Sequence, residues 1–154
     1  MLVHLVRHAH ALSRREWTGP DGSRPLSETG HLQARQFGSI PMATSVEVRS
    51  SPAVRCIETI RPLAETLGTE IVVDERLAEA ADPQVVAEWM CFTHRFEEVV
   101  LCGHGDLLPE VLRLLQLRGM ILDGPNAVAK ASLWPCHIVD GAPVRATYTP
   151  PPPV

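Results

Sequence analysis

The chain has 154 residues, 45% of them hydrophobic and 21% charged, and its formal net charge is −4. This length and composition predict one folded domain over 1–154 with a hydrophobic core of its own. The acidic balance argues against a nucleic-acid-binding protein, and no hydrophobic run reaches the roughly 20 residues of a membrane-spanning helix. We therefore expect neither a nucleic acid nor a membrane as a partner.

Four cysteines are spread over the chain without a CxxC pair: Cys56, Cys91, Cys102 and Cys136. This spacing lacks the close ligand pairs of a zinc site and is typical of free thiols in a reducing compartment. The N-terminus has no basic segment followed by a hydrophobic stretch, so no secretory signal is expected. These features together predict a cytoplasmic protein.

The N-terminal segment 1–6 predicts a buried strand, because it is almost wholly hydrophobic apart from His4. It leads directly into Arg7 and His8, two side chains that suit a phosphoryl group. The polar stretch 13–27 follows. Its length favours a binding loop or a lid over a simple connection.

The residues around Ser51 predict the start of a long helix. Ser51 is expected to cap it and Pro52 to occupy its first helical position. The helix is expected to run over 52–67 and to end at Gly68. Because Pro62 lacks an N–H group, we expect it to kink this helix or to begin a second segment.

The remaining elements alternate between strands and helices until late in the chain. Further helices are predicted over 28–38, 83–92 and 108–117, and further strands over 46–50, 70–73, 99–102, 131–134, 137–139 and 145–148, followed by an extended proline tail over 150–153. The alternation predicts a mainly parallel sheet with helices on both faces, and the late strands predict an antiparallel edge. The expected fold class is α/β, a three-layer α/β/α sandwich.

Three of the predicted strands end in a polar turn that leads into a helix. Arg7 and His8 follow the first strand, Arg55 lies in the helix after the second, and His104 follows the strand over 99–102. Because the carboxyl ends of parallel strands meet at one edge of a sheet, these four side chains are expected to converge. Two guanidinium groups, two imidazoles and the nearby helix N-termini suit a dianionic phosphoryl group.

Four ordered blocks of the sequence resemble the histidine phosphatase superfamily, also called the phosphoglycerate mutase-like fold. The blocks are Leu5-Val6-Arg7-His8-Ala9, the segment 24–30 with Gln33-Ala34, the segment 50–59 with Ile60 at the usual alanine, and Val100-Leu101-Cys102-Gly103-His104. The short SixA-like bacterial members are similar in the loop residues Arg14, Trp17, Gly19, Pro20 and Asp21 and, near the C-terminus, in the segments 130–134 and 140–141 and in Pro150-Pro151. The resemblance implies a phosphoglycerate mutase-like fold and a phosphatase that needs no cofactor.

The resemblance also implies roles for the converging residues. His8 is the expected nucleophile, which forms a phosphohistidine intermediate, while Arg7, Arg55 and His104 bind the phosphoryl oxygens and stabilise the transition state. For this reaction His8 must present a neutral nitrogen, so its other ring nitrogen needs an acceptor, and two neighbouring arginines would lower its pKa. No metal is expected, because two arginines and a histidine supply the positive charge.

The general acid that protonates the leaving group is expected to be a carboxylate near the site. Glu79 occupies the position, after the third strand, at which the family usually has a glutamate. Glu75 is a weaker candidate. Asp106 is a rival, because some relatives use an aspartate just after the second histidine, although here it lies two residues after His104.

The short connection after Glu79 predicts an open pocket. Only about 24 residues separate it from His104, so the long capping insertion of the mutases is missing. This favours a phosphorylated protein side chain, such as phosphohistidine, or another bulky substrate, with inorganic phosphate as the product. The loop 14–24 would then supply specificity, with Arg14 or Arg15 reaching a substrate phosphate.

Three alternatives remain open at the level of the sequence. The chain could act on a small phosphorylated molecule or a nucleotide, or it could be a module that binds phosphate without turnover. A metal site at His8 and His10, with His4 nearby, is the third alternative. It is disfavoured because the adjacent arginine repels a cation.

Overall fold

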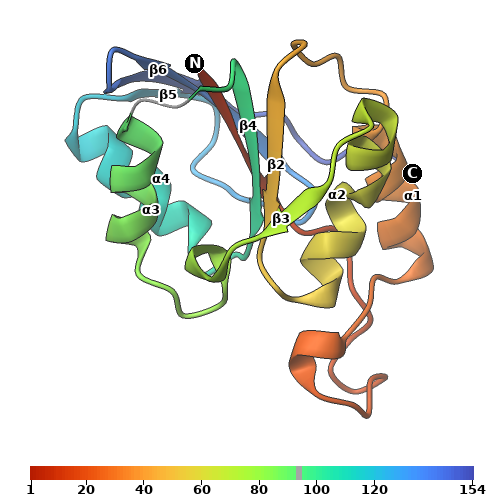
Figure 1. Ribbon diagram of the computed structural model, residues 1–154. Coiled ribbons are helices and arrows are strands. Elements are labelled where there is room, and N and C mark those ends of the chain that lie inside the picture. Colours follow the sequence, from red (N-terminus) through yellow and green to blue (C-terminus); the bar gives the residue numbers. More distant parts are fainter. Residues whose placement is uncertain (93–94) are drawn as a thin grey trace.

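The computed structural model describes residues 1–92 and 95–154, and Figure 1 shows them arranged around one twisted sheet. Within these residues the sheet has seven strands in the order β3-β2-β4-β1-β6-β7-β5. The strands are β1 (Leu2–Arg7), β2 (Val46–Ser50), β3 (Ile71–Val73), β4 (Glu98–Gly103), β5 (Ile121–Asp123), β6 (Leu133–Val139) and β7 (Ala142–Thr147). The helices are α1 (Glu28–Phe37), α2 (Val54–Leu67), α3 (Pro83–Cys91) and α4 (Leu108–Leu117), with the 3₁₀ turns η1 (Asp21–Ser23) and η2 (Glu75–Leu77).

The expected three-layer sandwich is confirmed. Strands β3, β2, β4 and β1 pair in parallel, whereas β6 is antiparallel to both β1 and β7. Figure 1 shows α3 and α4 on one side of the sheet and α1 and α2 on the other. Strand β4 supplies both cores, because Val99 and Leu101 belong to the cluster under α3 and α4, while Val100 and Cys102 belong to the opposite cluster. A strand that is buried on both faces needs an unbroken hydrophobic run.

The strand register brings the predicted turns to one edge. Arg7 of β1 lies opposite Gly103 of β4, and Ser50 of β2 lies opposite Cys102. The residues that follow each of these three strands therefore leave the sheet side by side. This alignment of carboxyl ends is what positions the candidate site.

Helix α2 begins later than the sequence predicts. Its N-cap is Ala53, not Ser51, and the first helical residue is Val54, not Pro52. Ser51 is still held in the sheet edge, because its N–H donates to the carbonyl of Cys102 at 2.9 Å. Its hydroxyl is occupied by His104, at 2.8 Å, as well as by the N–H of Ala53. The expected cap residue therefore belongs to the candidate site.

The alternative that Pro62 begins a second segment is also wrong. Helix α2 runs as one element over Val54–Leu67, with Pro62 inside it. Its buried neighbours Ile60 and Leu63 pack into the core on either side of the proline, which stabilises the helix despite one missing hydrogen bond. The prediction for its end is confirmed, because Gly68 has the left-handed φ of 64° that terminates many helices.

The C-terminal strands differ in part from those expected. The two strands predicted over 131–134 and 137–139 form one element, β6, with a register shift between His137 and Ile138. It begins only at Leu133, because Ala131 has a positive φ of 62°, which does not fit a strand. Strand β5, which was not predicted, pairs with β7. No helix in the described part of the chain has the length and hydrophobicity needed to cross a bilayer.

Candidate active site

The structure brings Arg7, His8, Arg55 and His104 together at the carboxyl edge of the sheet. The imidazole rings of His8 and His104 are edge to face, with their centroids 5.5 Å apart. His8, Arg55 and His104 are 6%, 1% and 2% exposed. Buried arginines are unusual unless they are paired, and a cluster of buried cationic and imidazole groups beside a hollow is typical of functional sites.

His8 is held with one ring nitrogen free. Its Nδ1 lies 2.8 Å from the carbonyl of Ala9, and because a carbonyl only accepts, Nδ1 carries the proton and Nε2 has a lone pair. The pKa of His8 is lowered to about 3, mainly by burial and also by the charges of Arg55, His104 and Arg7, although the hydrogen bond to Ala9 acts in the opposite direction. The expected backbone acceptor is present, but burial contributes more to the lowered pKa than the two arginines do. The result is a neutral imidazole, as a nucleophile requires.

Arg7 is fixed from two sides. Its Nη1 donates to the carbonyl of Val128 at 2.7 Å, while Gly105 lies directly against the guanidinium. A Cβ at position 105 would lie 2.6 Å from Cζ of Arg7, so only glycine allows this approach. The buried Nε of Arg7 has no hydrogen-bond partner among the described residues, which leaves a donor for an oxyanion.

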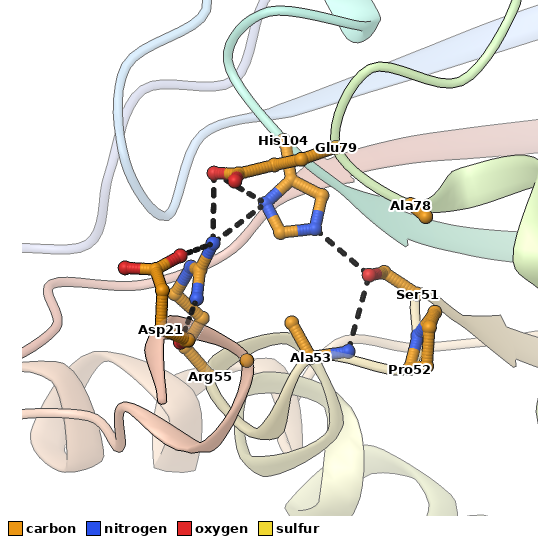
Figure 2. A pocket seen from close by; sticks show the side chains of 9 residues that line it. Asp21, Ser51, Pro52, Ala53, Arg55, Ala78, Glu79 and His104 are labelled. Carbon is orange, nitrogen blue, oxygen red and sulfur yellow. Dashed lines mark hydrogen bonds and ion pairs between the residues drawn. The ribbon is translucent and has the colours of Figure 1, made fainter. Parts of the chain in front are cut away.

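Arg55 is a buried member of the site, although an arginine in the first turn of a helix is often solvated. Figure 2 shows its guanidinium between Asp21 and Glu79. Its Nη1 donates to the Asp21 carbonyl at 2.9 Å, and its Nη2 donates to Glu79 Oε1 at 2.8 Å. Nη2 also lies 3.4 Å from Nδ1 of His104. Arg55 therefore links the loop 13–27 to the strand-end residues.

The three candidate acids occupy different places. Glu79 Oε1 lies 3.6 Å from His104 Nδ1, and the side chain is 44% exposed, so it faces both the site and solvent. Asp106 lines the His8 hollow with Arg7, and it accepts the N–H of Ala80 at 2.8 Å. Glu75 is exposed at the start of η2 and lines neither hollow described below.

Two adjoining hollows meet at Glu79. The first, which we call the His104 hollow, measures about 280 Å³ and is drawn in Figure 2. The second, the His8 hollow, measures about 360 Å³. The charged and imidazole side chains of the His104 hollow are Asp21, Arg55, Glu79 and His104, and those of the His8 hollow are Arg7, His8, Arg14, Arg24, Glu79, Asp106 and Lys130.

Several residues of these hollows were not among the expected site residues. Arg24 is nearly buried and donates to the Leu12 carbonyl at 2.7 Å and to Asp21 at 3.1 Å. Arg24 and Ser51 lie inside blocks that resemble the superfamily, which was the available signal. Lys130 begins the segment 130–134 that resembles the SixA-like members, and the fold brings it to the same hollow as His8. Arg14 lines the His8 hollow, as expected, whereas Arg15 lines neither.

The other histidines of the first segment have separate partners. His4 Nε2 lies 2.7 Å from Glu98 Oε2, on β1 and β4. His10 Nδ1 lies 2.6 Å from the Ser27 hydroxyl at the start of α1. Among the described residues, no group of three metal-ligating side chains gathers at these positions.

The sequence is similar to that of known phosphatases. The family model of the histidine phosphatase superfamily (branch 1) matches residues 3–82. An 8-oxo-(d)GTP phosphatase of Mycolicibacterium smegmatis is 30% identical over 155 residues, which cover 97% of this chain and 48% of the relative. The chain thus spans about half the length of this curated relative.

Two solved structures are similar in fold. The protein histidine phosphatase SixA, complexed with tungstate, has a TM-score of 0.74 at 17% identity, with 97% of this chain and 94% of that chain covered. A mycobacterial glucosyl-3-phosphoglycerate phosphatase with VO3 has a TM-score of 0.64 at 18% identity, with 96% of each chain covered. The expected SixA-like fold is confirmed. With the match of the family model over half of its length, the chain belongs to the histidine phosphatase superfamily, branch 1.

Proposed function

We propose that the chain is a metal-independent phosphatase that acts through a phosphohistidine formed on His8. The observation that carries this proposal is the state of His8, a neutral imidazole with its free Nε2 among the cationic groups of Arg7 and Arg55. A neutral nucleophile in a cationic pocket suits attack on a phosphoryl dianion, because the cations neutralise the charge that would repel it.

The proposed reaction has two steps. In the first, His8 Nε2 attacks phosphorus, the bond from phosphorus to the leaving oxygen or nitrogen breaks, and Arg7, Arg55 and His104 hold the phosphoryl oxygens. In the second, water attacks the phosphohistidine, the N–P bond breaks and inorganic phosphate leaves. Attack and departure occur in line, which the rigid placement of His8 by the Ala9 carbonyl supports.

Glu79 is the proposed general acid of the first step and the base of the second. Its carboxylate lies where the two hollows meet, within reach of a leaving group bound near His104. Asp106 is less suited, because its Oδ2 is engaged by the N–H of Ala80. When a phosphoryl group binds, its oxygens would accept the N–H groups of Arg55 and so replace Glu79 in the ion pair with Arg55.

Two substrate classes fit the open hollows. Among the described residues, the short segment between Glu79 and His104 has one α-helix, α3, and none of its residues lines either hollow, which supports a phosphorylated protein side chain such as phosphohistidine. The relative named 8-oxo-(d)GTP phosphatase supports a nucleotide as the second class. The four free cysteines support a reducing, cytoplasmic setting for either reaction.

The test is phosphate release by wild type and His8→Ala in the presence of EDTA, with phosphohistidine protein, nucleotides and p-nitrophenyl phosphate as substrates. We expect His8→Ala to lose about 10³-fold or more, because the variant lacks the imidazole nitrogen that forms the proposed phosphohistidine. Acid-labile ³²P on wild type and none on His8→Ala would support the intermediate. Retained turnover by a folded His8→Ala protein would overturn the proposal, and phosphate binding without turnover by wild type would indicate a binding module.

A further inference from the structure

The His8 hollow gathers four cationic side chains against the two carboxylates of Glu79 and Asp106. Arg7, at its inner end, belongs to the proposed phosphoryl site with Arg55 and His104. Arg14, Arg24 and Lys130 also line the His8 hollow, which does not include Arg55 or His104. In a chain with a net charge of −4, four cationic side chains around one hollow indicate an anionic ligand.

Lys130 is positioned by hydrogen bonds to the catalytic segment itself. The N–H of Ala131 donates to the carbonyls of Arg7 and His8, at 3.2 and 3.1 Å, and the N–H of Arg7 donates to the carbonyl of Ser132. The Val128 carbonyl accepts from the Arg7 guanidinium. The loop 128–132 is thus attached to Arg7 through both main chain and side chain, and it carries Lys130 into the hollow beside it.

The positive charge of Lys130 is not neutralised locally. Within the described residues it has no ion-pair partner. Lys130 is an exposed residue at the mouth of the hollow, yet the partial desolvation of its ammonium group lowers its pKa, as do the charges of Arg7 and Arg24. An ammonium group held among guanidinium groups is destabilised until an anion binds among them.

Arg14 and Arg24 share a single carboxylate. Asp21 Oδ1 lies 3.4 Å from Arg14 Nε and 3.1 Å from Arg24 Nε, and its Oδ2 lies 3.3 Å from Arg55 Nη2. One negative charge therefore faces three guanidinium groups. Arg14 contacts Asp21 only through Nε, and its side chain is 73% exposed at the rim of the hollow. Its terminal nitrogens therefore take no part in these ion pairs.

We propose that Lys130, Arg14 and Arg24 form a subsite for a second phosphate, next to the phosphoryl group that His8 attacks. This inference rests on the proposed function and deepens it. Because the backbone on either side of Lys130 is anchored to the Arg7–His8 segment, a second anion bound by Lys130 in this hollow lies near the first, as the two phosphates of an anhydride do. A phosphorylated protein side chain has one phosphate and would leave this subsite empty. The substrate class is therefore a phosphoanhydride, such as a nucleoside diphosphate or triphosphate.

The same subsite would assist departure of the leaving group. His8 Nε2 forms a bond to the terminal phosphorus, the bond to the bridging oxygen breaks, and its electron pair remains on the shortened phosphate. Lys130 and Arg14 stabilise this charge, so little proton transfer is needed. Water then cleaves the N–P bond and yields inorganic phosphate. In the described residues, neither hollow is lined by Phe, Tyr or Trp, so neither offers a phenyl, phenol or indole ring to stack on a base.

The test compares kcat/KM for ADP, GDP, AMP and p-nitrophenyl phosphate in EDTA, using wild type, Lys130→Ala, Lys130→Arg and Arg14→Ala. Arg61→Ala, an exposed residue of α2 outside both hollows, is the matched control. We expect wild type to prefer ADP over AMP by about tenfold or more, and Lys130→Ala to lose about tenfold on ADP but less than about threefold on the monoesters. Lys130→Arg should retain most activity on ADP, and GDP should match ADP.

Other outcomes separate this inference from the proposed function. Equal turnover of ADP and AMP, or an equal loss on both in Lys130→Ala, would overturn the second subsite while leaving the phosphatase intact. Turnover of phosphohistidine protein above that of ADP, unchanged in Lys130→Ala, would do the same and assign the protein substrate. Absence of phosphate release from every substrate, with a folded wild-type protein, would overturn the proposed function itself.

Discussion

At the scale of single residues, the site depends on close contacts that only one residue type allows. Gly105 is one of these positions. It follows His104 and lies against the flat face of the Arg7 guanidinium, which is also anchored by the Val128 carbonyl. Because the arginine is held at both places, it has little freedom to accommodate a methyl group.

Gly105→Ala is therefore expected to disable the site without unfolding the protein. The new Cβ would lie 2.6 Å from Arg7 Cζ, so the guanidinium must move away from the phosphoryl position. A loss of about 10²-fold in kcat/KM is expected, comparable to the removal of one oxyanion donor. Gly103→Ala is the control, because its Cβ would meet Leu108 and Leu77 only at an ordinary 3.5 Å. Similar activity of the two variants would show that Arg7 is not fixed in this way.

At the scale of elements, the turn between η2 and α3 positions Glu79. Ala80, the next residue, has a positive φ of 61°, a conformation that is costly for a residue with a Cβ. Asp106, at the start of the connection into α4, accepts the Ala80 N–H at 2.8 Å. This hydrogen bond joins the turn to the strand end that carries His104. We therefore assign Asp106 a positioning role.

Variants of Asp106 separate positioning from acid catalysis. Asp106→Asn keeps an oxygen acceptor for Ala80, so it should retain kcat on alkyl monoesters within about threefold, whereas Asp106→Ala should lose about tenfold. Glu79→Gln should show a larger loss on alkyl than on aryl monoesters, because poor leaving groups need the proton. The measurement is kcat on alkyl and on aryl monoesters for each variant. If Asp106 were the acid, Asp106→Asn and Asp106→Ala would lose the same amount of activity on alkyl monoesters.

At the scale of the whole molecule, a neutral buried His8 links stability to pH. Its pKa is about 3 in the folded protein and near 6.5 when the chain is unfolded. Between these values the unfolded chain binds more protons than the folded one. The contribution of neutral His8 to the free energy of unfolding is therefore fully present above pH 6.5 and is lost as the pH falls towards 3. The site therefore weakens the fold in acid.

His8→Asn should remove this dependence. Between pH 7 and pH 5, wild type should lose up to about 2 kcal/mol more unfolding free energy than the variant, at 1.36 kcal/mol per pH unit below 6.5. Urea unfolding at constant ionic strength measures the difference. His137→Asn, at an exposed position of β6, should keep the wild-type slope. An unchanged slope in His8→Asn would place the acid-sensitive group elsewhere.

Local rules predicted the strands and helices whose sequence agrees with their surroundings. The alternation at 46–50 and the hydrophobic periodicity at 108–117 match β2 and α4. These local rules failed where tertiary contacts compete with the local preference of a residue. Ser51 has the sequence of an N-cap but hydrogen-bonds His104, and Pro62 stays inside α2 because its neighbours pack in the core.

By itself the sequence determined the α/β class and the residues that end the strands, because periodicity and turn signals are local. The convergence of Arg7, His8, Arg55 and His104 also followed, since parallel strands align their carboxyl ends. Only the tertiary structure decided that Glu79 lies between two hollows, that Asp106 holds Ala80, and that a distant loop carries Lys130 to His8. These contacts join segments 26 to more than 100 residues apart, so packing and long-range hydrogen bonds, which no local pattern encodes, decide them.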